Sequence, residues 1–381
     1  MEHSQLNAGQ APALRAFHTG LQYPHSKAVP ETGFAEAWLH LEHYARLPTQ
    51  SRHFTYAMAQ TMLERSTVEV FAAPGYEAIG AILPLCRSPE YFSRWRMIGA
   101  DEIYEPGDAL YDCPDAARML APLLISDGRA FQFDRVPEGS HFISALQAAS
   151  KKKGHLRITP ARSCPTIALD ESWAEPHEKF NAGRRSDFRR AGRKAKETGE
   201  VSLDVLIPQP YQFDTLFDEA CTLEMRSWKR EAGTAIACDP QKEAFFRAYF
   251  RACCEKQTFC IAFMRVDGKP VATQLAVIEA DSYWLFKIAY DNAYRKCSPG
   301  TLLMLATLGW AAKRGLRAYE LLGEDESWIS DFWTRDTHPC VQLRYYPYSL
   351  RGLMNFGQDG AGWLKSRLHR SRDGNASGTT E

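Results

Sequence analysis

The sequence predicts an α/β protein built from two similar halves. Apolar residues switch repeatedly between helical and strand-like spacing along the chain. The elements predicted for each half follow one order, which is two helices, three strands, a helix, a strand, a helix and a strand. The chain has 381 residues, whereas a typical domain has about 150. We therefore expect more than one domain, each with a sheet flanked by helices.

The first half opens with two amphipathic helices. Phe34, Trp38 and Leu41 recur at helical spacing, and a second apolar stripe covers 56–63. Apolar runs bounded by turn residues then predict strands, and two helices separate the later strands. The strands are expected at 67–72, 78–86, 94–98, 130–136 and 156–159, and the two helices at 116–126 and 142–151.

The second half repeats this order. Aromatic residues at helical spacing predict helices over 213–223 and 245–250. The Asp267-Gly268 turn between two apolar runs predicts a β-hairpin. The remaining elements are strands at 259–266, 270–278, 283–290, 318–322 and 341–346, and helices at 301–314 and 326–333. We expect the strand at 341–346 to end the sheet of this half.

Prolines mark the connection between the halves. Pro160, Pro165 and Pro176 break regular structure there, which places the boundary near 160–175. The predicted units are a first domain, a second domain and a disordered Gly/Ser/Thr-rich tail, at residues 1–165, 166–370 and 371–381.

Composition excludes several classes of protein. Lys plus Arg (46) equals Asp plus Glu (46), so no overall field favours nucleic acid or an anionic membrane. The N-terminus lacks a signal-peptide pattern, and the most apolar helix-length window, 301–312, is too short to span a bilayer. The ten cysteines form no CxxC pair, which favours reduced thiols, and His40 and His43 lack a third metal ligand. We expect a cytoplasmic protein without a metal.

The most informative stretch joins the strand that ends at Tyr290 to the apolar helix that follows. Ser298, Pro299 and Gly300 are typical of a helix start. Free N–H groups, the helix dipole and the cations of 295–296 form an anion site suited to pyrophosphate. An ordinary capped loop with solvated cations would explain the same residues.

Several short motifs in this half resemble those of the GNAT superfamily of acyl-CoA transferases, and specifically its FemAB-like branch associated with bacterial polysaccharide biosynthesis. In chain order the motifs are Arg226-Ser227-Trp228-Lys229, Gly268-Lys269-Pro270-Val271-Ala272, Tyr290-Asp291, Ser298-Pro299-Gly300-Thr301-Leu302-Leu303 and Leu322-Gly323-Glu324-Asp325-Glu326-Ser327-Trp328. The resemblance covers roughly 164–347. It implies tandem GNAT-like domains, each with a mixed, mostly antiparallel twisted sheet, the first being a degenerate copy.

The resemblance also implies acetyl-CoA, or another acyl-CoA, as co-substrate. The CoA phosphates would rest on the loop at 295–301, and the pantetheine arm would enter between the strands at 283–290 and 318–322. The residues assigned to the donor are Arg295, Lys296, Ser298, Gly300 and Thr301, and those assigned to the substrate are Trp228, Lys287, Tyr290 and Trp328. Relatives commonly carry an aromatic-Lys pair where this chain has Trp328-Ile329, so the substrate class stays open.

The corresponding loop of the first half has the opposite charge. Residues 99–114 contain five acidic residues and no Lys or Arg. Carboxylates would repel a pyrophosphate over a few ångströms. We therefore expect only the second half to bind CoA, with the first half acting as a scaffold or as a wall of the acceptor cleft.

Acyl transfer from a thioester needs a general base for the acceptor and a proton for the leaving thiolate. Glu324 follows the strand at 318–322, on the usual ligand side of an α/β crevice, and is the preferred base. Asp291 is a second carboxylate near the cleft, and Tyr345 is a candidate acid. Helix capping and packing would explain these residues equally well. Cys297 has no adjacent His to activate it as a nucleophile.

A basic helix is predicted over 182–196. Seven Lys or Arg lie between 184 and 196, with Asp187 as the one acidic residue. The helix could hold a phosphate-bearing acceptor, an anionic membrane or tRNA, or it could be a solvated charged face.

The sequence thus predicts an acyl-CoA-dependent N- or O-acyltransferase, of the acetyltransferase type. Its acceptor would be an amino or hydroxyl group of a sugar, a polysaccharide or a lipid-linked envelope precursor. The protein would be cytoplasmic, at the inner membrane face if 184–196 binds lipid. The alternatives are an aminoacyl-tRNA-dependent transferase of the FemAB type, which zero net charge disfavours, and a non-catalytic binding module, which Ile329 favours.

Overall fold

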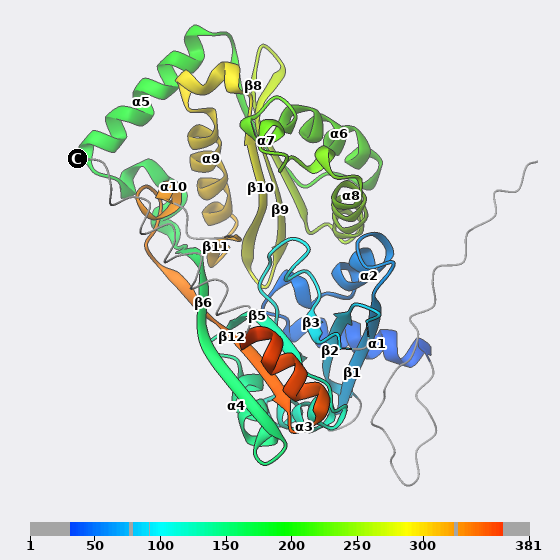
Figure 1. Cartoon of the computed structure of the whole chain (residues 1–381). Helices are drawn as coiled ribbons and strands as arrows, with labels where there is room; N and C mark the ends of the chain where they lie inside the picture. The colour runs from blue at the N-terminus through cyan, green and yellow to red at the C-terminus, as the bar shows by residue number, and fades with distance from the viewer. Residues whose placement is uncertain (1–30, 76–78, 91, 324–326, 361–381) are drawn as a thin grey trace, which may run out of the picture.

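The computed structural model describes residues 31–75, 79–90, 92–323 and 327–360. Its strands form one twelve-stranded sheet in the order β1-β2-β3-β5-β12-β6-β11-β10-β9-β8-β7, with β4 paired to β2 (Figure 1). Most neighbouring strands are antiparallel, but β3 with β5 and β10 with β11 are parallel. The mixed, mostly antiparallel α/β fold expected from the sequence is confirmed.

The first part of the sheet is covered on both faces. Helices α3 and α4 lie over one face, around a core that includes Phe131 and Phe133, and α1 packs Trp38 against the other face. The elements are α1 (Glu31–Leu41), α2 (Arg52–Thr61), β1 (Thr67–Pro74), β2 (Ile79–Arg87), β3 (Trp95–Met97), β4 (Leu110–Tyr111), α3 (Pro114–Ser126), β5 (Phe131–Pro137), α4 (His141–Ser150) and β6 (Gly154–Ala168). Side chains of Ser51 and Ser140 cap α2 and α4 by accepting backbone N–H bonds.

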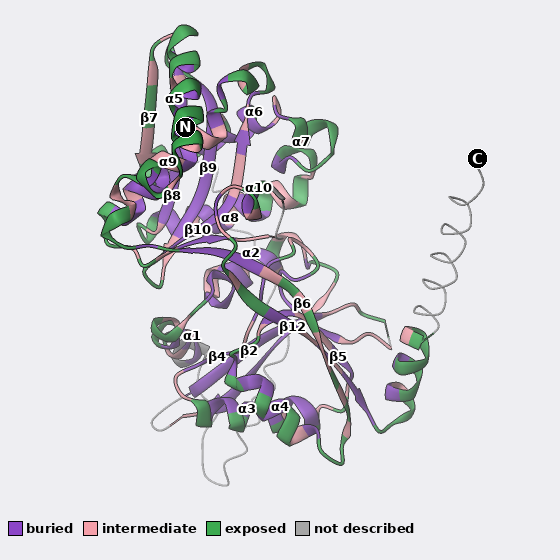
Figure 2. Ribbon diagram, turned by 90° about the vertical axis from the view of Figure 1, so that its left-hand side faces the viewer, coloured by how far each residue is buried: buried purple, intermediate pink, exposed green. Residues whose placement is uncertain are grey.

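The second part is arranged in the same way. Helices α6 and α8 bury aromatic side chains against one face of the sheet, and α9 packs Met304 and Leu308 against the other (Figure 2). The elements are α5 (Ala182–Glu197), β7 (Val201–Leu206), α6 (Phe213–Glu224), α7 (Trp228–Glu231), α8 (Pro240–Glu255), β8 (Phe259–Val266), β9 (Lys269–Glu279), β10 (Ser282–Tyr290), η7 (Asn292–Cys297), α9 (Pro299–Lys313), β11 (Ala318–Leu321), α10 (Ser327–Ser330) and β12 (Thr337–Pro347). A further helix covers 350–360.

The last strand departs from the prediction. β12 was expected to end the second part of the sheet, but it lies between β5 and β6 in the first part. The cause is the length of β6, whose 15 residues pair first with β12 and then, over 166–168, with β11. β12 buries Val341, Leu343 and Tyr345 in the core of the first part. After the second part of the sheet, the chain therefore returns to the first part with β12, so the predicted boundary does not separate the two parts completely.

The two parts of the sheet also meet through α2 and α8. The ring of Phe54 on α2 lies 5.4 Å from Phe245 and 5.3 Å from Tyr249 of α8, both edge-on. This shared core fixes the loops of the first part next to β10 of the second.

Candidate functional site

A cavity of about 470 Å³ opens where β10 and β11 part. Its walls come from α7, β10, the first turn of α9, the end of β11 and the segment around α10. The lining residues are Trp228, Lys229, Leu285, Phe286, Lys287, Ile288, Ala289, Tyr290, Gly300, Thr301, Met304, Leu321, Leu322, Trp328, Ile329 and Trp333.

The opening follows from the unequal lengths of the two strands. β11 ends at Leu321 and pairs with β10 only over 282–285, whereas β10 continues to Tyr290 along β9. The β9 pairing shifts register between Leu285 and Lys287, as at a β-bulge. Within the described residues, the backbone of 286–290 is therefore open on its β11 side. Such N–H and C=O groups can bind an extended ligand or polarise a thioester carbonyl.

The first turn of α9 closes one end of the cavity. Ser298 adopts a left-handed conformation (φ 49°, ψ 54°), which turns the chain into the helix, and Pro299 occupies the first helical position. Gly300 and Thr301 then line the cavity. The helix start therefore directs its partial positive charge toward the open edge of β10.

Cations surround this helix start. Arg295 and Lys296 are exposed in η7, immediately before α9. Helix α5 packs against both η7 and α9 (Figure 1). Burial raises the pKa of the Cys297 thiol, and the charge of Lys194 on α5 opposes that shift. The basic helix α5 therefore adds to the positive potential around the loop at 295–301. The sequence alone had not linked this helix to that loop.

Lys287 lies in the cavity wall on β10. Its Nζ lies 4.7 Å from the centre of the Phe246 ring. Burial lowers the pKa of Lys287, and the nearby charge of Lys229 lowers it further, while Glu224 and Glu105 oppose the shift. This amine is therefore closer to neutrality than an exposed lysine.

Glu105, on a loop of the first part of the sheet, does not line the cavity but lies near enough to Lys287 for their charges to interact. The residue is only 7% exposed. Within the described chain its Oε2 atom is buried and has no hydrogen-bond partner. Burial raises the pKa of Glu105, while Arg135 and Lys287 oppose the shift. Glu105 and Lys287 thus influence each other's charge, and of the two it is Lys287 that lines the cavity.

Arg135 holds the loop that carries Glu105. Its guanidinium donates to the carbonyl oxygen of Tyr104 at 2.5 Å and lies 4.8 Å from the Tyr104 ring centre. It also donates to the carbonyl oxygen of Gly323, just beyond β11, and to the sulfur of Cys164. One buried arginine therefore joins the acidic loop to the edge of the cavity.

Glu224 positions Lys229 in the opposite wall. The Lys229 Nζ lies 3.0 Å from Glu224 Oε1, and Glu224 Oε2 accepts the backbone N–H of Ile236 at 2.7 Å. The Ser227 side chain caps α7 by accepting the Lys229 N–H. The Arg226-Ser227-Trp228-Lys229 motif thus places an indole and an ammonium group side by side in the cavity wall.

The structure brings many of the predicted site residues together. All four substrate assignments (Trp228, Lys287, Tyr290 and Trp328) line the cavity, as do Gly300 and Thr301. Arg295, Lys296 and Ser298 occupy the loop that leads into α9.

Of the three predicted catalytic residues, the two that the structure describes do not lie together. Asp291 is buried, caps η7 by accepting the Ala293 N–H at 2.9 Å, and lies 3.7 Å from Arg226. Tyr345 does not reach the cavity, because β12 carries it into the first core, where its ring stacks on Phe131 at 5.0 Å. Glu324 lies outside the described residues.

The described residues contain no group of three or more His, Cys, Asp or Glu side chains that could hold a metal ion. No helix in the described ranges is both long enough and apolar enough to cross a bilayer. The ten cysteines, all within the described ranges, form no disulfide there.

Residues 182–329 match a family described as an acetyltransferase (GNAT) domain. No curated protein matches the chain at a significant level. Among solved structures, FemX has a TM-score of 0.56 at 11% identity and covers 84% of this chain and 96% of its own. The C-terminal domain of a candidate lysylphosphatidylglycerol synthetase from Agrobacterium fabrum has a TM-score of 0.52 at 13% identity and covers 81% of this chain and 90% of its own. At these identities the likeness shows the fold.

Proposed function

Because this chain is a member of the GNAT superfamily, with its GNAT domain at residues 182–329, we propose that it transfers an acyl group from an acyl-CoA to an amino or hydroxyl group. The observation that carries the proposal is the cavity between β10 and β11, which the N-terminus of α9 closes at one end. An open strand edge and a helix start beside cations match the two parts of CoA, a pantetheine arm with amide groups and a pyrophosphate.

In this proposal the donor is divided between the cavity and the surface. The cavity of about 470 Å³ would hold the acyl group and the pantetheine arm. The pyrophosphate would accept N–H bonds from the first turn of α9, and the nucleotide would lie over Arg295, Lys296 and the adjacent face of α5.

The chemistry requires one proton to move. The acceptor nitrogen or oxygen attacks the thioester carbonyl, gives up its proton and becomes acylated, while the C–S bond breaks and the CoA thiolate takes up a proton. We assign the proton-accepting role to Lys287 and Glu105 acting together, because Lys287 lines the cavity and Glu105, whose buried Oε2 has no hydrogen-bond partner, interacts with it electrostatically. Glu324, favoured by its place after β11, is the competing candidate.

The acceptor side of the cavity is aromatic. Trp228 and Trp328 line it and are both exposed, and Trp333 lies beside them. Indole faces pack well against the apolar faces of sugar rings. This supports a sugar-containing acceptor, such as a polysaccharide or a lipid-linked envelope precursor.

Release of the CoA thiol from acetyl-CoA tests the function. Wild-type protein should release thiol faster with an amino sugar than with water, and the product should carry one acetyl group by mass spectrometry. Lys287→Met should lower the rate, whereas Lys313→Met, at an exposed site on the far end of α9, should not. Thiol release that no amine or hydroxyl acceptor increases would count against the proposal.

The basic helix supports a second candidate, an aminoacyl-tRNA-dependent transferase. Arg185, Arg189 and Lys196 are exposed on α5, and this helix packs beside η7, so the positive surface is larger than the loop alone. The test is a gel shift with tRNA over a salt series, in which a specific complex would weaken steeply as salt rises. Reversal of Arg189, Arg190 and Arg193 to Glu would remove such a complex. If that variant instead loses acetyl-CoA binding while folded, α5 belongs to the donor site.

A further inference from the structure

The helix at 350–360 has its polar side turned inward. Gly352, Asn355 and Asp359 face the body of the protein, and Asn355 is only 2% exposed. A surface helix normally buries its apolar stripe and exposes its polar side. Here most of the arrangement is reversed, although the Phe356 ring packs edge-on against the Tyr346 ring at 5.3 Å.

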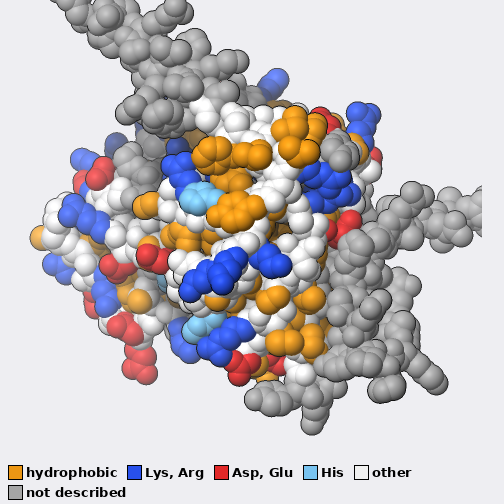
Figure 3. Space-filling view, turned by 60° about the horizontal axis from the view of Figure 1, so that its bottom comes forward, with side chains coloured by type: hydrophobic (Ala, Val, Ile, Leu, Met, Phe, Trp, Pro, Cys, Tyr) orange, Lys and Arg blue, Asp and Glu red, His pale blue; other side chains and the backbone are white. Residues whose placement is uncertain are grey.

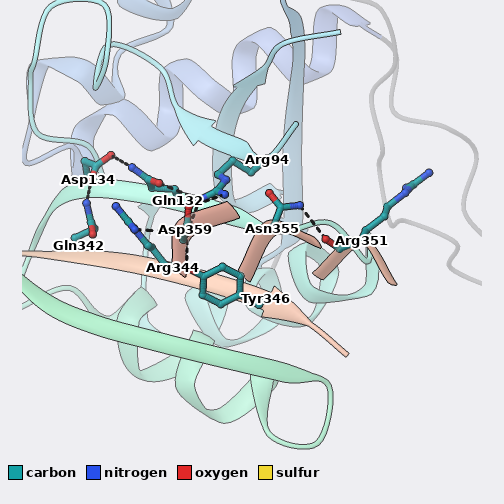
Figure 4. Close-up of polar contacts among 9 residues, drawn as sticks. All are labelled: Arg94, Gln132, Asp134, Gln342, Arg344, Tyr346, Arg351, Asn355 and Asp359. Carbon is teal, nitrogen blue, oxygen red and sulfur yellow. Dashed lines mark hydrogen bonds and ion pairs between the residues drawn. The ribbon is translucent and has the colours of Figure 1, made fainter. Parts of the chain in front are cut away.

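Polar contacts hold the helix in place (Figure 4). The Asp359 carboxylate accepts two bonds from the Arg94 guanidinium, at 2.9 and 3.1 Å, and a further bond from the Tyr346 hydroxyl. Arg344 approaches the same carboxylate at 3.5 Å. A Cβ atom at Gly352 would overlap the carbonyl oxygen of Pro347, so only glycine allows this close approach. The orientation is therefore specifically fixed.

The outward side is apolar. Leu350 is 81% exposed and Leu353 67% exposed, and Met354 and Phe356 are exposed beside them. Tyr348, at the start of the helix, is 72% exposed. Large apolar side chains that gather on one exposed face mark an interaction site.

Cations border this apolar face. Lys151, Lys152 and Lys153 are all exposed at the turn between α4 and β6. The Tyr348 N–H donates to the Lys153 carbonyl oxygen at 2.9 Å, which places this turn beside the start of the helix. Figure 3 shows hydrophobic side chains interspersed with Lys and Arg on this end of the molecule.

We propose that the helix at 350–360 and the Lys151–Lys153 turn form a docking surface for an anionic lipid bilayer. Leu350, Leu353 and Met354 would enter the boundary between headgroups and acyl chains, and the lysines would lie over lipid phosphates. The helix would lie in the plane of the membrane. This surface is separate from α5 and does not depend on the transferase activity.

Charge favours lipid over a second copy of this chain. Two copies joined through this face would bring one lysine turn toward the other, which costs free energy unless an acidic partner intervenes. A bilayer that contains anionic lipid offers both an apolar layer and negative charge. The sequence after residue 360 has a similar composition, since 361–372 contains Trp363 and four Lys or Arg but no Asp or Glu.

Vesicle flotation of the full chain tests the proposal. The wild type should float with vesicles of equal parts phosphatidylcholine and phosphatidylglycerol, and less with phosphatidylcholine alone. The triple variant L350Q/L353Q/M354Q should partition about 100-fold more weakly, since partial burial of each of the three apolar side chains contributes about a factor of five. Lys151→Glu with Lys152→Glu and Lys153→Glu should remove the preference for anionic vesicles.

Matched controls separate this surface from other causes. Leu203→Gln with Leu206→Gln changes exposed leucines on β7 and should leave flotation as in the wild type. Circular dichroism should show that every variant is folded. The proposal is overturned if the wild type does not float, if the L350Q/L353Q/M354Q variant floats as the wild type does, or if sedimentation shows a dimer that this variant abolishes. Each result is independent of whether acetyl-CoA binds.

Discussion

Gly300→Val adds a branched side chain where the first turn of α9 faces the cavity. The protein itself leaves room for the substitution. A Cβ atom at this position would meet only the Tyr290 ring, at 3.6 Å, which is an ordinary contact. Valine is about 0.4 kcal/mol more favourable than glycine in a helix. The free energy of unfolding should therefore stay the same or rise by a few tenths of a kcal/mol.

The same side chain should block a phosphate. If pyrophosphate accepts N–H bonds from this turn, the valine methyl groups would displace at least one charge-assisted hydrogen bond. The loss amounts to about 2 kcal/mol, or roughly a 30-fold weaker affinity for acetyl-CoA. Isothermal titration measures the affinity, and urea unfolding measures the stability of the same preparation.

Gly309→Val is the matched control in the same helix. Its Cβ would lie 3.1 Å from the Ala174 carbonyl oxygen and 3.2 Å from Pro176, so the larger side chain would not fit. We expect it to destabilise the fold by about 1–3 kcal/mol and to bind acetyl-CoA normally where folded. The reasoning is refuted if Gly300→Val binds acetyl-CoA as the wild type does, because the phosphates would then lie elsewhere.

Three further changes test the site and its surroundings. Arg295→Ala should weaken acetyl-CoA binding by about 1–3 kcal/mol, the range of a charge-assisted hydrogen bond, whereas unchanged affinity in titration would move the donor from this loop. Glu105→Gln should lower kcat more than it changes KM. In the wild type, kcat/KM should rise with pH through the raised pKa of Glu105, and the variant should lack this rise because only the carboxylate accepts a proton. A pH–rate profile unchanged from the wild type would favour Glu324 as the base. Burial raises the pKa of Glu279 to about 8, above its unfolded value, so ionisation favours the unfolded chain and stability should fall as pH rises between those two values. Urea unfolding of Glu279→Gln should lack this part of the pH dependence, and an equal fall in both proteins would contradict the assignment.

The spacing of apolar residues predicted most of the helices and strands, because each element shows its period within a short stretch of sequence. This spacing could not predict in which part of the sheet a strand is paired. The alternation of Val341, Leu343 and Tyr345 correctly indicates a strand with one buried face. Only the long β6, which pairs with β12 and β11 in turn, determines that this face belongs to the first core. β7 was not predicted, since it is a short edge strand whose six residues are all exposed or half-buried.

The candidate site, like the fold, could be predicted from the sequence only in part. Residues in the motifs around Trp228, Tyr290 and Gly300 converge on one cavity because each motif sits at the end of an element next to the parting strands. Glu105 was seen only as part of an acidic loop that would repel phosphate. Its burial, its electrostatic interaction with Lys287 and the hydrogen bond of Arg135 to the neighbouring Tyr104 depend on how the two parts of the sheet pack. No sequence signal distinguished it from the other acidic residues of that loop.

The central claim is that one donor site lies between β10 and β11. Isothermal titration of acetyl-CoA into the full chain tests it most directly, with Gly300→Val titrated in parallel. The account predicts one site per chain and a clear loss of affinity in the folded variant. No binding, two sites per chain, or equal affinity in the two proteins would contradict it.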